Sequence, residues 1–425
     1  MKSDLSGGNI KAAQKRFNHM SGTDKKGALY LLEAGRLAQL SGRYQSAKAA
    51  YAKVIDQIAD SQMAAKIQVS RLLEMTGALL TNDRVLPYRV PDYAITFLYP
   101  YQALNYLAEG NLSGALVVIR QLSNAEYWMY QQRLMTGELK SKYHREIAEA
   151  GIDDKNFGLD HSQKLKAMFQ KADNIENAYE NGFSYYFAAI LYQAFDENFN
   201  NAFVSIKHAK RLLPDNPYVD QTYLEIKRGF NGNNAYGKGK GRLVVIYEQG
   251  FVTAKSAFKL PLFLGKLGLQ EIAVPYYPSD YQNLPPLDVR IMKDKKTITQ
   301  GKTAILVNTT EMAMKSLKEA YPGIITREIV RLIIKSLVTF KASQQAGIWG
   351  TLIGSVYSFA SAEADERSWL LLPNNIQLYE KQLAEGAYAI NVDNLEKHFH
   401  INAQRTTLLW IVQAGAFNRM YLFYL

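Results

Sequence analysis

The chain has 425 residues, of which 48% are hydrophobic and 21% are charged, so it is long enough for two or three domains and too apolar to be disordered throughout. It contains no cysteine, which excludes disulfide bonds, thiolate catalysis and zinc sites built on cysteine. The formal net charge is +11. The excess of basic over acidic residues is small and evenly spread along the chain, except in the basic segment Met1–Lys26. We interpret that segment as a solvated basic helix, with an anionic partner surface as the alternative.

Pairs of short amphipathic helices recur in the first half of the chain. The three predicted pairs span Ala28–Ile58, Phe97–Leu122 and Phe183–Tyr218. Small residues stand where paired helices must cross closely, such as Gly35 in the first pair and Ala189 in the third, and Pro214 ends the third pair. This spacing is typical of tetratricopeptide units, which stack because one pair cannot bury its apolar face alone. Two further helices, over 124–149 and 162–178, are expected as spacers.

A stack of such units has a concave face, where a partner peptide or helix usually lies. The helical register places seven side chains on that face: Leu32, Arg36, Gln39, Phe97, Leu104, Phe187 and Leu191. The face is mostly apolar and lacks the lysine and asparagine pairs that clamp a terminal carboxylate. We predict partner binding there, while the same positions fit the core of the helix pairs equally well.

The composition changes at residues 230–241, a linker rich in glycine, lysine and asparagine that cannot hold a helix. Beyond the linker, strands are expected at Arg242–Tyr247, Ala257–Leu262, Ile272–Tyr277, Leu287–Met292, Thr303–Val307, Gln377–Leu383, Tyr388–Val392, Thr406–Val412 and Met420–Leu425. A helix is expected at Arg327–Ser343. The sequence therefore predicts an α+β, multidomain protein: an all-α tetratricopeptide-like solenoid over 1–229, then an α+β domain with a mixed sheet over 242–425.

Two patterns resemble binding motifs without completing them. The run Gly301–Thr303 resembles the end of a phosphate-binding P-loop, but Lys296 stands where that motif requires a glycine. His398 and His400 would share one face of a strand, yet a metal site needs three or four ligands and only Glu396 is near. A nucleotide site is therefore not expected, and surface histidines are the favoured interpretation of the histidine pair.

A carboxylate cluster and an apolar segment are neighbours in the second half. Glu363, Asp365 and Glu366 could serve acid–base chemistry in a hydrolase, but capping of a helix–strand junction balanced by Arg367 is the simpler interpretation. The preceding uncharged segment, 346–362, is at the short end of the range for a membrane span. We favour a closely packed buried helix there, with contact to lipid or another subunit as the alternative.

Three blocks of the sequence resemble a family of bacterial envelope proteins, usually lipoproteins, that have an N-terminal tetratricopeptide region. The blocks are Tyr101–Leu122, Val244–Phe263 and Ala364–Tyr388, of which the Arg367-Ser368-Trp369 and Leu372-Pro373 signature is the most specific. The resemblance implies a periplasmic, outer-membrane-associated protein with a role in assembly, because such proteins are often encoded beside small lipoproteins similar to activators of penicillin-binding proteins. The lipid-bearing cysteine and a signal peptide, which the family implies, are absent from this sequence.

These observations favour a non-enzymatic periplasmic scaffold or adaptor in a cell-envelope assembly for secretion, motility or cell-wall synthesis. Its expected partners are other envelope proteins, such as small outer-membrane lipoproteins or a larger secretion or motility complex, with peripheral membrane association. No cofactor, metal or nucleic acid is expected. The alternative is a module that binds an anionic polymer, peptidoglycan or lipopolysaccharide, through the basic N-terminus. A hydrolase that uses Glu363 and Asp365 is the third hypothesis.

Overall fold

The structure is a computed structural model, which describes residues 1–19, 25–68, 87–149, 162–195, 199–231, 236–263, 269–325, 327–329, 331–332 and 363–425. The helices are α1 (Lys2–Ser6), α2 (Ile10–Asn18), α3 (Ala28–Leu40), α4 (Tyr44–Gln68), α6 (Asp92–Ala108), α7 (Leu112–Glu149), α8 (Gln163–Ala172), α9 (Gly182–Phe195), α10 (Asn200–Leu212) and α11 (Pro217–Phe230), with a further helix over 309–325. The strands are β1 (Lys240–Gln249), β2 (Ser256–Phe263), β3 (Leu269–Tyr276), β4 (Asp288–Lys293), β5 (Lys296–Lys302), β6 (Ala304–Asn308), β7 (Asn375–Ala384), β8 (Gly386–Val392), β9 (Leu395–Ile401), β10 (Thr406–Ala414) and β11 (Phe417–Tyr424).

The helices pack in chain order as successive hairpins. Helix α3 packs on α4, α6 on α7, and α9 on α10, while α4 contacts α6 and α7 contacts α9. Helices α3, α6 and α9 are almost entirely buried, because they lie between the outer helices and the C-terminal strands. The three predicted helix pairs are therefore present as packed hairpins, whereas the likeness of their stack to a tetratricopeptide solenoid stays a prediction.

A five-stranded sheet lies beneath the inner helices, in the order β11-β10-β1-β7-β6. Strand β1 pairs parallel with β10 and antiparallel with β7, so the sheet is mixed. Side chains on one face of β1 and β10, among them Val244, Ile246 and Trp410, join the core formed with the helices. The prediction of an α+β protein with a mixed C-terminal sheet is confirmed.

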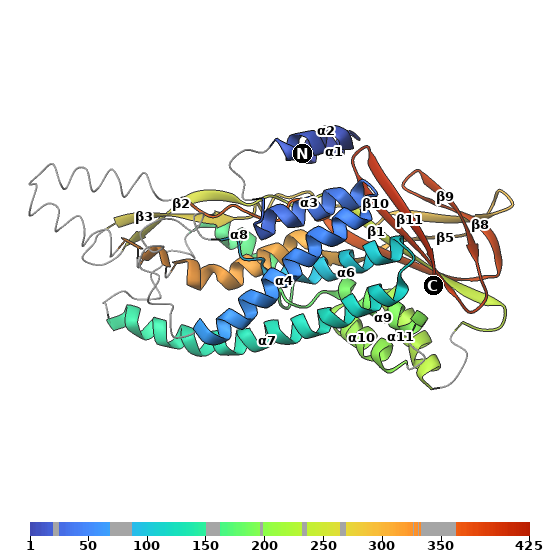
Figure 1. Cartoon of the computed structure of the whole chain (residues 1–425), viewed down its shortest axis with the longest axis horizontal. Coiled ribbons are helices and arrows are strands. Elements are labelled where there is room, and N and C mark those ends of the chain that lie inside the picture. Colours follow the sequence, from blue (N-terminus) through green and yellow to red (C-terminus); the bar gives the residue numbers. More distant parts are fainter. Residues whose placement is uncertain are drawn as a thin grey trace, which may run out of the picture.

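A second sheet, in the order β5-β4-β8-β9, covers part of the opposite face of the first sheet. Leu243, Val245 and Leu409 point to that side and pack with Ile291 and Ile390 of the second sheet. The central strands are consequently buried on both faces, which explains why RLVVIY and TLLWIV read as unbroken apolar runs. This sheet lies at one end of the molecule and the β2–β3 hairpin at the other (Figure 1).

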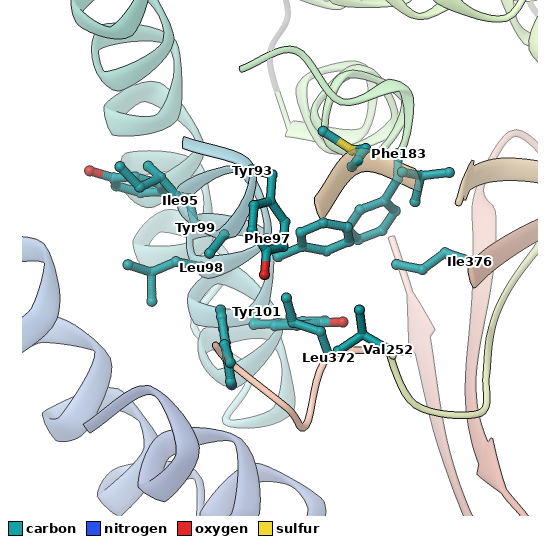
Figure 2. Close-up of a cluster of buried hydrophobic side chains, with 14 of the residues drawn as sticks. Tyr93, Ile95, Phe97, Leu98, Tyr99, Tyr101, Phe183, Val252, Leu372 and Ile376 are labelled. Atoms are coloured by element: carbon teal, nitrogen blue, oxygen red, sulfur yellow. The ribbon is translucent and has the colours of Figure 1, made fainter. Parts of the chain in front are cut away.

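The helical part and the strand part share one hydrophobic core. Helix α11 ends at Phe230 and β1 begins at Lys240, so secondary structure changes within the predicted linker. One continuous cluster of buried side chains nevertheless includes residues of α3, α6 and α9 together with residues of β1, β7 and β10. Figure 2 shows this contact, with Phe97 and Tyr101 of α6 directed toward Leu372 and Ile376. The two predicted domains are thus layers of one packed unit.

Several element boundaries differ from those expected. Helix α7 is continuous from Leu112 to Glu149, whereas a break was expected near 122–124. The polar residues at this point of α7 face solvent, and the helix continues through them. Helix α8 ends at Ala172, short of the expected 178. Strands β5 and β9 were not predicted. The segment 346–362, and residues 333–343 of the expected helix, lie outside the described residues.

The basic N-terminal segment packs against the body of the protein. Ala416 of the β10–β11 turn donates a backbone hydrogen bond to Ser6 at 2.8 Å. Lys2 donates from Nζ to the carbonyl oxygen of Val252 at 2.6 Å, and Arg16 pairs with Asp4 at 2.7 Å. Part of the positive charge of this segment is therefore used in internal contacts. Within the described residues, no helix is long and apolar enough to cross a bilayer.

Replacement of Gly35 by alanine should destabilise the protein, because α3 and α4 meet at that glycine. A Cβ atom there would lie 2.4 Å from Cε1 of Tyr51, whose side chain is fully buried and has no room to withdraw. We expect Gly35→Ala to lower the free energy of unfolding by about 1–3 kcal/mol, as measured by urea denaturation. Gly323→Ala is the matched control, since its Cβ would meet only the end of Arg327 at 3.4 Å. An unchanged midpoint for Gly35→Ala would contradict the close crossing.

Candidate functional site

The seven residues predicted to bind a partner lie together on one face, but that face is an internal contact. Leu32, Arg36, Gln39, Phe97, Leu104, Phe187 and Leu191 have at most 1% of their surface exposed. They cover the five-stranded sheet, as Phe187 does where its ring meets Trp410 at 5.1 Å. The expectation of an open groove is therefore corrected: the chain's own sheet occupies the face that was assigned to a partner.

A buried ion pair fixes the centre of this internal contact. Arg36 of α3 pairs with Glu248 of β1, and its guanidinium lies 4.1 Å from the centroid of the Tyr101 ring. Glu248 also accepts hydrogen bonds from Trp410 Nε1 at 2.7 Å and from the Tyr101 hydroxyl at 3.1 Å. Burial raises the pKa of Glu248, and the Arg36 charge opposes that rise. The ion pair between Arg36 and Glu248 joins the helix layer to the sheet, and a ligand cannot reach it.

The remaining motif residues are placed as their simpler interpretations require. Gly301 and Lys302 belong to strand β5, where Gly301 lies against the Tyr379 ring, so they form no phosphate loop. His398 and His400 are exposed on β9. No group of three or more His, Cys, Asp or Glu within the described ranges is placed to hold a metal ion. Asp365 accepts from Arg367 at 2.8 Å, which matches the predicted charge balance.

A polar pocket opens where α11 crosses the edge of β1 and β7. It has a volume of about 430 Å³. Its walls are formed by Gln221, Leu224, Glu225 and Arg228 of α11, Lys240 of β1, and Lys381 and Gln382 of β7. In the pairing of β7 with β1, Lys240 is opposite Ala384 and Lys381 is opposite Leu243, so the two lysines are three positions apart in register near the same end of the two strands. The pocket is lined by three cations and one carboxylate.

Beneath the pocket lies a network of buried polar side chains. Glu225 accepts hydrogen bonds from Gln221 at 3.0 Å and Gln382 at 2.5 Å, and it forms an ion pair with Arg242 at 3.3 Å. Glu380, on the neighbouring part of β7, accepts from the Tyr186 hydroxyl at 2.5 Å and from Thr222. Both carboxylate oxygens of Glu225 thus accept hydrogen bonds from the protein. The carboxylate that lines the pocket is already compensated.

The positive and negative charges of the buried network cancel. The charge of the pocket is therefore set by the exposed cations at its rim, Arg228, Lys240 and Lys381. Arg242 neutralises Glu225. Burial raises the pKa of Glu380 to about 8, an effect that Arg242 opposes and Glu225 reinforces, so Glu380 keeps its proton at neutral pH. Arg228, Lys240 and Lys381 are exposed, and none of them makes an ion pair or hydrogen bond through its side chain with the part of the chain that is described. Three uncompensated positive charges therefore converge on one concavity.

Sequence reasoning did not identify these residues, although a signal was present. In β1 the apolar run Leu243–Tyr247 is preceded by Arg242 and followed by Glu248, and in β7 Glu380 is a buried charge that follows Leu378 and Tyr379. A lone charge in a buried strand requires a partner, because an isolated buried charge is very costly. The partners come from helices far away in the sequence and could not be named from the strand alone.

Comparison of the chain with protein-family models, with curated proteins and with solved structures found no match.

Proposed function

We propose that this chain is a non-enzymatic binding protein of the bacterial envelope whose ligand is an anionic saccharide polymer. The observation that supports this proposal is the convergence of Arg228, Lys240 and Lys381 on one polar pocket without compensating partners among the described residues. Like charges held together in the absence of a ligand repel one another, and an anion relieves that repulsion. The envelope location comes from the family resemblance.

Peptidoglycan and lipopolysaccharide are the two sources of such a polymer. Of the two basic regions in the chain, the pocket is the better candidate for binding, because the N-terminal segment uses Lys2 and Arg16 in internal contacts. Binding through three cations should weaken steeply as salt rises, since each contact releases counterions from the polymer.

The test is binding of the full chain to purified peptidoglycan sacculi by co-sedimentation, and to lipopolysaccharide by biolayer interferometry, over a series of salt concentrations. We expect binding to one of the two polymers, and its loss in the double variant Lys240→Glu/Lys381→Glu. Lys227→Glu is the matched control, because Lys227 lies in the same turn of α11 as Arg228 but contacts the Tyr223 ring at 6.0 Å instead of the pocket. Equal losses in both variants, or no binding to either polymer, would refute the proposal.

A protein adaptor is the second candidate function. Seven of the nine exposed large hydrophobic residues of the described chain lie on α7, α10 and α11. Tyr127 and Leu134 of α7 are 67% and 53% exposed and are two helical turns apart on one side. A photo-crosslinking residue at Tyr127 should then give a defined product with one envelope protein. That product should disappear in Leu134→Ser and persist in the pocket variants.

A further inference from the structure

We infer that the group recognised by the pocket is a phosphate ester carried on a saccharide. This inference rests on the proposed function and specifies the ligand of that same site. It is argued from the number and kind of cations, from the hydrogen-bonding capacity of the walls, and from the size of the pocket.

The cations of the rim fit a phosphate better than a carboxylate. A carboxylate has two oxygens and a single negative charge, which one arginine can satisfy with two parallel hydrogen bonds. A phosphate monoester carries about −1.5 to −2 charges at neutral pH and has three strong acceptor oxygens. Arg228 supplies a planar fork from α11, and Lys240 and Lys381, on the strands that line the pocket, supply two point charges. Three donors of this kind match three oxygens, whereas a carboxylate would leave most of the positive charge uncompensated.

The walls add a surface suited to a sugar ring. The amide groups of Gln221 and Gln382 both donate to Glu225, so their carbonyl oxygens stay available as acceptors on the pocket wall. Hydroxyl groups of a saccharide are the donors that such oxygens need. Leu224, which is 51% exposed, lies on the same wall and offers an apolar surface to the C–H face of a ring. An inorganic ion would use none of these three side chains.

The size of the pocket supports a ligand larger than a single anion. Small-molecule sites usually have volumes of about 300–1,000 Å³. At about 430 Å³ the pocket is at the lower end of that range, which suits a monosaccharide phosphate or one terminal unit of a polymer. The pocket is lined mainly by polar side chains, and its three cationic residues are exposed, so the rest of a polymer chain would extend into solvent without entering the core.

Isothermal titration calorimetry of the full chain tests the inference with four probes: glucose 6-phosphate, glucuronate, glucose and inorganic phosphate. We expect glucose 6-phosphate to bind at least tenfold more tightly than each of the other three. Lys381→Ala should weaken that binding by about tenfold, and Arg228→Lys should weaken it by less, because a charge is kept and the fork is lost. Lys227→Ala should bind as the unaltered protein does. All three side chains are exposed, and equal urea midpoints will show that the variants are folded.

The outcomes separate the inference from the function on which it rests. If glucuronate binds as tightly as glucose 6-phosphate, the phosphate assignment is wrong while an anionic saccharide ligand stands. If inorganic phosphate binds as tightly, the saccharide assignment is wrong. Failure of all four probes, with sacculi or lipopolysaccharide still bound through Lys240 and Lys381, overturns the inference alone. Failure of the probes and of both polymers overturns inference and function together.

Discussion

Replacement of Arg36 by methionine is expected to lower the free energy of unfolding by about 3–5 kcal/mol, because it leaves the Glu248 carboxylate buried without its counterion. Both partners are inaccessible, with side-chain exposures of 1% and 0%. Trp410 and Tyr101 would still donate to Glu248, but two neutral donors replace little of the attraction of a cation in a medium of low polarity. Urea denaturation followed by tryptophan fluorescence measures the change.

A double-mutant cycle isolates the pair from the cost of losing packing. Glu248→Gln should destabilise the protein by a comparable amount, since it leaves the Arg36 charge uncompensated. The double variant Arg36→Met/Glu248→Gln buries no charge and should be much more stable than the sum of the single effects predicts. Arg211→Met provides the control for an arginine ion pair at the surface, where Arg211 is 42% exposed, and should cost less than about 1 kcal/mol. Additive effects of the two core substitutions would show that the pair does not hold the helices to the sheet.

The stability of the protein should fall as the pH rises from about 4.5 to about 8, and Glu33→Gln should remove a large part of that fall. Burial raises the pKa of Glu33 to about 8. Its Oε1 accepts from the backbone N–H of Leu370 at 2.5 Å, and its Oε2 is buried. The nearby Lys2 ammonium opposes the shift, and the buried hydroxyls of Tyr51 and Tyr88 also interact with Glu33.

The direction follows from the two pKa values. In the unfolded chain Glu33 loses its proton near pH 4.5, while in the folded protein it keeps the proton until about pH 8. Between these values the folded state binds the extra proton, so each unit of rising pH disfavours folding. At about 1.4 kcal/mol per unit, the loss approaches 5 kcal/mol above pH 8. Glu380 contributes in the same direction.

The experiment compares urea midpoints of the unaltered protein and Glu33→Gln from pH 5 to pH 9. The two proteins should be similar at pH 5, and the variant should be several kcal/mol more stable at pH 9. The control, Glu385→Gln, changes an exposed carboxylate and should leave the pH profile unchanged. Parallel profiles for Glu33→Gln and the unaltered protein would show that Glu33 titrates normally in the folded state.

Local periodicity was sufficient to predict much of the fold. The helix pairs could be recognised because small residues such as Gly35 stand at the helix crossings, with apolar neighbours at helical spacing. The close approach of Gly35 to Tyr51 is the physical reason for the small residue. The central strands could be recognised because Val244–Ile246 and Leu408–Trp410 are apolar on both sides, as strands between two layers must be. Each of these signals is carried by residues close together in the sequence.

Strands β5 and β9 gave no comparable signal. Strand β5, KTITQGK, lies at the edge of its sheet, and its side chains are exposed or half-buried on both faces, so no alternation marks it. In β9 only Phe399 and Ile401 are buried, and Lys397 interrupts the apolar face between Leu395 and Phe399, so the alternation is short. Both strands are specified by the tight turns that precede them, where Asp294, Lys295, Asp393 and Asn394 have positive φ angles.

The candidate site could not be derived from the sequence, because it is assembled from distant segments. Arg228 is on α11, Lys240 is on β1 and Lys381 is on β7, and only the folded chain brings these three segments to one pocket. The prediction of a partner-binding face was wrong for a related reason. An apolar helix face reads the same whether it is covered by another protein or by the chain's own strands, and Phe187 meets Trp410 across more than two hundred residues.

The parallel pairing of β1 with β10 has a consequence for synthesis on the ribosome. Arg242 and Thr406 are 164 residues apart, so β1 leaves the exit tunnel long before its neighbour has been translated. During that interval the buried faces of α3, α6 and α9 lack the side chains of β10 that complete their cover, and they must be shielded from aggregation or remain unfolded. We therefore expect a nascent chain that stops before β10 to recruit chaperones, and the emergence of β10 and β11 to complete folding in one cooperative step.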